Sequence, residues 1–160
     1  MYLTIDFARK TSGIAYENQK GKIKHWSVEG LNIEKLHKIF KKHPFIYCLI
    51  EIPPLIPRRG VRETIIQAGE LAGAMSYWGI KVYYLMANQW RKLVGVGGKN
   101  REVVREREKE KIKELYPEFK NLTDDEMEAV LMLKALKELV RNDDKERELE
   151  KIFKKVEKSA

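Results

Sequence analysis

The chain is a basic polypeptide of 160 residues, of which 35% are charged, more than the roughly one quarter that is usual in globular proteins. Its 32 Lys and Arg residues against 24 Asp and Glu residues give a formal net charge of +8, and 43% of the residues are hydrophobic. This length and composition predict one globular domain and exclude a disordered chain. The single Cys48 excludes an intrachain disulfide and a cysteine-based zinc site, because both require more thiols.

The sequence favours a cytoplasmic location and nucleic acid as a partner. No apolar stretch approaches the roughly 18 residues of a membrane-spanning helix, and the N-terminal sequence lacks the pattern of a secretory signal. The positive net charge favours nucleic acid as a partner. Residues 121–133, in contrast, contain no Lys or Arg but hold four carboxylates: Asp124, Asp125, Glu126 and Glu128. This acidic segment is either a charged helix start or part of a functional site.

The first part of the chain contains three short segments rich in β-branched and aromatic residues, joined by tight connections. They predict an antiparallel meander of strands at residues 2–7, 12–17 and 22–28. The spacing of apolar residues then predicts a helix over residues 31–43. The nearly continuous apolar run at residues 45–52 predicts a strand that is buried on both faces.

The second part of the chain predicts one more strand, over residues 80–85, among several helices. We expect these helices at residues 62–78, 88–94, 100–116, 124–139 and 143–158. A meander followed by βαβ crossovers predicts an α/β fold with a mixed sheet and helices on its faces. We place the domain at residues 1–140 and treat residues 141–160 as a charged C-terminal helix of the same domain.

Two carboxylates stand at the ends of predicted strands. Asp6 ends the first strand, and Glu51 lies near the end of the buried strand 45–52. Burying a carboxylate there is costly unless it is paired or bound to a metal. If the two strands are adjacent and parallel, Asp6 and Glu51 lie side by side at one edge of the sheet. Taken singly, each side chain could instead meet solvent or a backbone N–H.

The acidic segment adds further carboxylates to this set. Thr123 and Glu126 have the spacing of a capping box, which fixes the start of a helix. Asp125 and Glu128 then lie three residues apart on one helix face. Converging carboxylates without His or Cys suit Mg²⁺ or Mn²⁺, and two such ions can promote phosphodiester hydrolysis.

Basic residues near these carboxylates are candidate phosphate contacts. Arg58, Arg59 and Arg62 follow Glu51 closely in the sequence. Lys99 and Arg101 stand at a helix start after the glycine-rich segment 95–98, which matches neither a P-loop nor a dinucleotide-binding loop. This segment either binds a phosphate or is an ordinary connector. The alternating charges over residues 101–110 predict a solvated, ion-paired helix face, and we expect the tryptophans in the core or at an interface.

Five segments occur in the order in which one known family carries them: Leu3–Asp6 through Gly13, Leu49–Glu51, Gln67–Gly73, Leu93–Gly97 and Asp125–Ala129. Together they resemble RuvC-type Holliday junction resolvases, nucleases of the RNase H-like superfamily. The resemblance covers about residues 1–140. It implies a five-stranded RNase H-like sheet, a homodimer, and Mg²⁺-dependent nicking of branched DNA with two ions per active site.

The resemblance also implies roles for individual residues. It maps catalytic, metal-binding carboxylates onto Asp6, Glu51, Asp125 and Glu128, with Asp124 as a rival of Asp125. Arg101 falls where the family tends to carry a basic residue that faces DNA. The helix of residues 62–78, with Gly69 and Gly73 on one face, is our candidate for the dimer interface.

Two departures from the family pattern keep other functions open. Glu128 replaces the usual final Asp, and Ile52–Pro57 stands where the family commonly places an aromatic residue. The first hypothesis is therefore a metal-dependent endonuclease that resolves four-way junctions. The alternatives are a non-catalytic nucleic-acid-binding or scaffold protein on the same fold, and an RNase H-like nuclease that acts on RNA or RNA–DNA hybrids.

Overall fold

A computed structural model describes the backbone of residues 1–54, 56 and 58–159. Its centre is a five-stranded mixed sheet with the strand order β3-β2-β1-β4-β5. The first three strands form the predicted antiparallel meander: β1 (Tyr2–Asp6), β2 (Thr11–Glu17) and β3 (Ile23–Glu29). The last two continue the sheet in parallel with β1: β4 (Tyr47–Ile52) and β5 (Lys81–Met86). The predicted α/β fold and strand set are confirmed.

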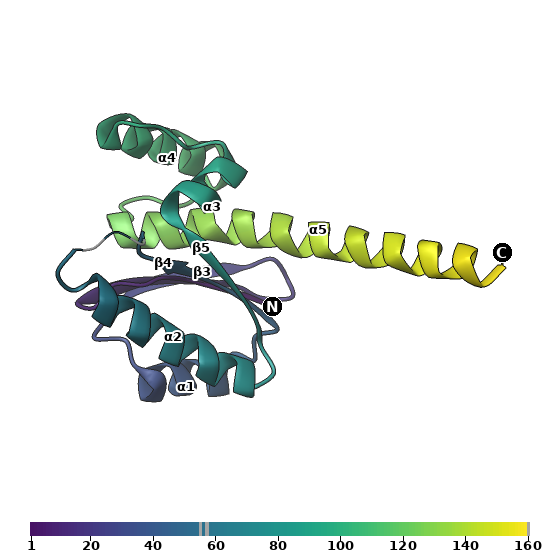
Figure 1. Ribbon diagram of the computed structural model, residues 1–160. Coiled ribbons are helices and arrows are strands. Elements are labelled where there is room, and N and C mark those ends of the chain that lie inside the picture. The colour runs from purple at the N-terminus through teal and green to yellow at the C-terminus, as the bar shows by residue number, and fades with distance from the viewer. Residues whose placement is uncertain (55, 57, 160) are drawn as a thin grey trace.

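Helices cover both faces of the sheet, which gives three layers (Figure 1). One face packs against α1 (Ile33–Lys42) and α2 (Val61–Tyr77). The other face packs against the first half of α5 (Asp124–Ser159), which lies across β1 and β2. On top of α5 lie α3 (Ala87–Val94) and α4 (Arg101–Leu115). Each layer boundary holds its own apolar core.

The C-terminal region corrects one expectation. We expected separate helices at residues 124–139 and 143–158, but α5 is a single helix of 36 residues. The expected break, Val140–Asn142, contains neither Pro nor Gly, so nothing interrupts the backbone hydrogen bonds. The far end of α5 extends beyond the sheet (Figure 1). In the described part of the chain, no helix combines the length and apolarity needed to cross a bilayer; the cytoplasmic location stays a prediction.

Strand alternation decides which side chains face α5. In β1, Leu3 and Ile5 point into the core under α1 and α2, so Thr4 and Asp6 point the other way. The Thr4 hydroxyl donates a buried hydrogen bond of 2.6 Å to the carbonyl of Ala129 in α5. This bond fixes the helix above β1, close to the end at which Asp6 stands.

Candidate metal centre

Asp6, Glu51 and Glu128 converge from three separate elements. The parallel register pairs Ile5 of β1 with Ile50 of β4, and the next residue in each strand is a carboxylate. Glu128 reaches the same place from the second turn of α5. One oxygen of each of the three carboxylates lies within 4.8 Å of the others. The structure thus brings together three of the four residues predicted to bind metal.

A glycine lets the start of α5 approach the sheet at this point. Gly13 of β2 is the cross-strand partner of Asp6. A Cβ atom at Gly13 would stand 2.0 Å from the backbone oxygen of Asp125, so only glycine leaves room for the helix. The predicted capping box also forms: Glu126 N–H donates to Thr123 Oγ1 at 3.2 Å, and Thr123 N–H donates to Glu126 Oε2 at 3.0 Å.

The two rival aspartates at the start of α5 have different surroundings. Asp124 is half exposed and forms an ion pair of 2.7 Å with Arg105. Asp125 lies outside the compact group of three, but its charge is among those that raise the pKa of Asp6. Asp125 is therefore the better candidate for a fourth ligand, and this assignment stays a prediction.

Burial, with added repulsion between neighbouring charges, opposes the ionisation of these carboxylates. Burial raises the pKa of Asp6 to about 9, and the charges of Glu51 and Glu128 add to the effect. Burial also raises the pKa of Glu128 to about 7, against the opposing charge of Arg91. The pKa of Glu51 is raised by burial, although the hydrogen bond from Trp90 favours its ionised form. Three crowded oxygen ligands of this kind fit a hard divalent cation, which would favour their charged forms.

Two adjacent residues of α3 contact this centre, and the sequence did not indicate either. The indole Nε1–H of Trp90 donates to Glu51 at 2.5 Å, and the guanidinium of Arg91 donates to Glu128 at 2.9 Å. Arg91 also donates to Glu108 of α4 at 2.7 Å. Glu108 is only 1% exposed, which contradicts the predicted solvated face over residues 101–110. Glu108 lies four residues from Val104 and four from Ile112, which are both buried. This helical spacing could have indicated that Glu108 shares their buried face.

A cleft of about 560 Å³ opens beside the carboxylates. Glu51, Arg91 and Glu128 line it, and so do the predicted phosphate contacts Lys99 and Arg101. The described lining does not include the other three predicted contacts, Arg58, Arg59 and Arg62. In the segment that leads to them, Leu55 and Pro57 lie outside the described residues.

The glycine-rich segment at the cleft's edge is tied to α4. Gly95 ends α3 with a positive φ of 77°, a conformation that favours glycine. The Arg107 side chain donates to the carbonyl oxygen of Gly97. The segment is therefore held in place and leads Lys99 to the cleft.

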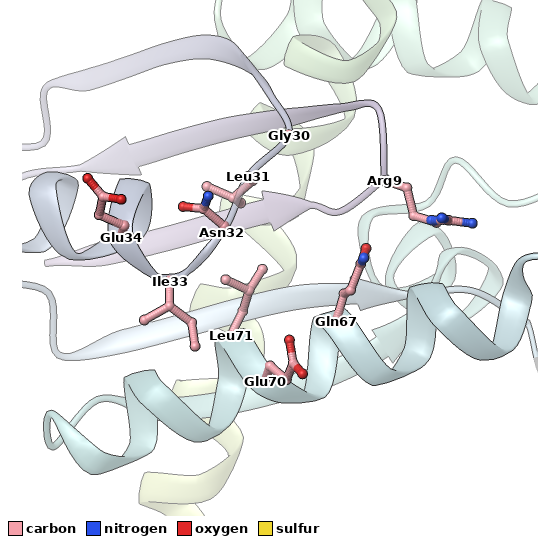
Figure 2. A pocket seen from close by; sticks show the side chains of 9 residues that line it. All are labelled: Arg9, Gly30, Leu31, Asn32, Ile33, Glu34, Gln67, Glu70 and Leu71. Carbon is pink, nitrogen blue, oxygen red and sulfur yellow. The ribbon is translucent and has the colours of Figure 1, made fainter.

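A second cavity, of about 470 Å³, lies between the start of α1 and α2. Figure 2 shows the side chains that face it, among them Arg9, Glu34, Gln67 and Glu70. These residues mix one base, two acids and an amide, and the carboxylates that converge on one point are not among them. Of the two sites, only the first has the chemistry of a metal centre.

A mixed five-stranded sheet with carboxylates at the ends of β1 and β4 and near the start of α5 defines an RNase H-like fold. Among solved structures, the chain is similar to RuvC of Thermus thermophilus, with a TM-score of 0.61, 12% sequence identity, and coverage of 84% of this chain and 91% of that chain. It is also similar to T. thermophilus RuvC in complex with a Holliday junction substrate, with a TM-score of 0.61, 10% identity, and coverage of 84% and 92%. These matches confirm the resemblance to RuvC at the level of the fold. No protein-family model and no curated protein sequence matches the chain.

Proposed function

We propose that the protein is a divalent-metal-dependent endonuclease that cleaves phosphodiester bonds in branched DNA. The specific reaction that we propose is the resolution of Holliday junctions by paired nicks in a homodimer. The observation that carries the proposal is the convergence of Asp6, Glu51 and Glu128 within 4.8 Å beside a cleft with basic residues. The similarity in fold to a protein solved with a Holliday junction substrate supports the choice of substrate.

In this proposal the carboxylate centre binds Mg²⁺ or Mn²⁺, and Asp125 completes the set of Asp6, Glu51 and Glu128. When bound, two such ions stabilise the attacking and leaving oxygens of a phosphodiester displacement. The chain itself supplies orientation: the hydrogen bond from Trp90 fixes one oxygen of Glu51. Lys99 and Arg101 at the cleft hold the DNA backbone without reading its sequence, because they contact phosphates.

The exposed face of α2 supports the homodimer. Gly69 and Gly73 have no other group within 4 Å of the position of an added Cβ atom. On the same face, Ile66 is 51% exposed and Tyr77 is 90% exposed. An apolar helix face with glycines suits close packing against a second copy, and paired nicks need two related active sites. Light scattering at micromolar concentration should give the mass of a dimer; a monomer would contradict this part of the proposal.

The decisive experiment is cleavage of a synthetic four-way junction by the wild type and by Asp6→Asn. The variant keeps the shape of the side chain but removes a charged ligand, so we expect cleavage with Mg²⁺ or Mn²⁺ to be abolished while junction binding survives. Glu34→Gln, which removes an exposed carboxylate from α1, is the matched control and should cleave normally. Equal cleavage by Asp6→Asn, or none by the wild type, overturns the proposal. Flap, duplex and RNA–DNA hybrid substrates in the same assay separate the alternative nucleases.

A further inference from the structure

An apolar pocket of about 370 Å³ lies between the second half of α4 and the start of α5. Ile112 and Met127, which are both buried, line it together with Phe119 and Leu122. The described lining contains no acidic residue but includes three lysines: Lys109, Lys113 and Lys120. The pocket therefore suits a ligand that joins an apolar group to negative charge.

This pocket is a neighbour of the cleft at the carboxylate centre. On α4, Arg105 lines the cleft and Lys109 lines the pocket. On α5, Glu128 lines the cleft and the preceding residue, Met127, lines the pocket. Arg105 and Lys109 lie about 6 Å apart along the helix axis, close to the length of about two nucleotides on one strand of B-DNA. A strand that occupies the cleft thus reaches the pocket within a few nucleotides.

Two residues of the pocket have the chemistry to hold a nucleobase. The Phe119 ring is fixed by stacking on Tyr116, at 5.8 Å between ring centres, and by an edge contact with His25 at 4.9 Å. Such a ring offers apolar contact and stacking to any base. Asn121, held at a positive φ of 60°, carries an amide with both donors and acceptors, which is what the edge of a base requires.

We propose that this pocket binds one unpaired nucleobase of branched DNA. Phe119 contacts the base, Asn121 bonds to its edge, and the three lysines contact the phosphates on either side. The inference rests on the proposed function and deepens it, because it names a subsite that distinguishes branched DNA from a continuous duplex. A base at a branch point costs less to unstack than one inside a duplex.

An acidic peptide with an apolar side chain would also match the three lysines. The position of the pocket favours DNA, since the same strand that carries phosphates past Lys99 and Arg101 in the cleft passes this pocket next. The amide of Asn121 adds a group that reads a base edge, whereas carboxylates need only the cations.

The test measures affinity in EDTA, without cleavage. In a synthetic four-way junction, nucleotides near the branch point are replaced one at a time by an abasic residue, which removes the base but keeps the phosphate. At the nucleotide whose base enters the pocket, we expect the wild type to lose about tenfold in affinity, as is typical of one stacked base. Phe119→Leu should bind the intact junction about fivefold more weakly and lose less than about threefold at that nucleotide.

Two comparisons make this result specific to the pocket. Tyr84→Leu removes an exposed aromatic ring that lies on the other face of the sheet from Tyr83 and Leu85, and it should match the wild type at every nucleotide. Phe119→Leu should bind a fully paired duplex as well as the wild type does. If thermal unfolding shows that Phe119→Leu does not fold, Asn121→Gly replaces it, because glycine accepts the positive φ and lacks the amide.

Three outcomes overturn the inference. The variant keeps the wild-type loss at every nucleotide, or it weakens junction and duplex equally. In the third, the abasic pattern is unchanged but the variant weakens binding of a fluorescein-labelled peptide of four glutamates around one leucine, which assigns the pocket to a protein partner. If the wild type binds junctions but cleaves none, the proposed function fails while the scan still decides the pocket. If the wild type cleaves junctions and the scan gives one of the three outcomes, this inference fails alone; if it binds none, both fail.

Discussion

The two faces of the sheet are built from the same strands but bury different kinds of groups. The face under α1 and α2 encloses an apolar core that includes Leu3, Ile5 and Ile50. The face under α5 also has an apolar core, but at one end it carries the crowded carboxylates and the buried ion pair of Glu108 with Arg91. One face thus mainly stabilises the fold, and the other also holds the groups capable of chemistry.

This division follows from the two-residue period of a strand. Neighbours in β1 and β4 point to opposite faces, so Ile5 and Ile50 can secure the core while Asp6 and Glu51 remain free for the centre. Substitutions on the α5 face should therefore alter chemistry and ionisation, whereas substitutions on the α2 face should alter only stability or association. Substitutions on each face can test this difference.

The largest effect is expected for Glu51→Gln, which removes the charge of a proposed metal ligand from the α5 face. We expect junction cleavage to fall by about a thousandfold or more, because several kcal/mol of the transition-state stabilisation that we propose for bound ions would be lost. Cleavage kinetics with Mg²⁺ measure this. Glu70→Gln on α2 is the control. Comparable losses of cleavage in both variants would contradict the expectation that chemistry depends on the α5 face and not on the α2 face.

Gly13→Ala should produce the next largest effect, on stability. The added Cβ atom would stand 2.0 Å from the Asp125 backbone oxygen, and a backbone clash cannot be relieved by rotating a side chain. We expect the free energy of unfolding to fall by about 3 kcal/mol, measured by urea denaturation. An unchanged midpoint would show that α5 does not press on β2 here.

Asp6→Asn should stabilise the metal-free protein in a pH-dependent manner. The pKa of Asp6 is raised from 3.8 to about 9, chiefly by burial, so the folded state retains a proton that the unfolded state releases. The wild type therefore loses stability as the pH rises from about 4 towards 9, and Asp6→Asn avoids that loss. Unfolding in EDTA should show a difference of several kcal/mol near pH 8 that shrinks towards pH 4. A pH-independent difference would contradict the raised pKa.

Gly73→Ala on α2 should give the smallest effect. Nothing lies within 4 Å of the added Cβ atom, and alanine favours a helix interior by about 0.5–1 kcal/mol over glycine. At concentrations where the protein is monomeric, thermal unfolding should shift upward. At higher concentrations a tighter or unchanged dimer would show that Gly73 is not at the interface.

The sequence predicted the fold and the three converging carboxylates because those signals are local. Alternation and apolar runs define strands, and a buried strand that ends in Asp6 or Glu51 is visible without knowledge of the partners. The capping box at Thr123 was likewise contained in four residues. The continuous helix α5 was predicted as two helices, although no Pro or Gly between them interrupts a helix.

The rest of the site depends on contacts between distant elements. Arg91 resembles any cation in a short helix until α4 is placed beside α3, and Glu108 was hidden among the exposed acids around it. Trp90 was expected in the core or at an interface; it is buried in the core, and its indole also donates to Glu51. The distinction between Asp124 and Asp125 likewise depended on Arg105, which lies in another helix.

The bond between the Thr4 hydroxyl and Ala129 joins groups 125 residues apart in the chain, and this separation has a consequence for the timing of synthesis. The bond between Thr4 and Ala129 can form only after α5 has been synthesised. The five strands of the sheet, in contrast, are all complete before α3 begins. A nascent chain that has emerged only as far as α4 contains all five strands but lacks Glu128. The proposed nuclease activity is thus withheld from the unfinished protein until its last helix docks.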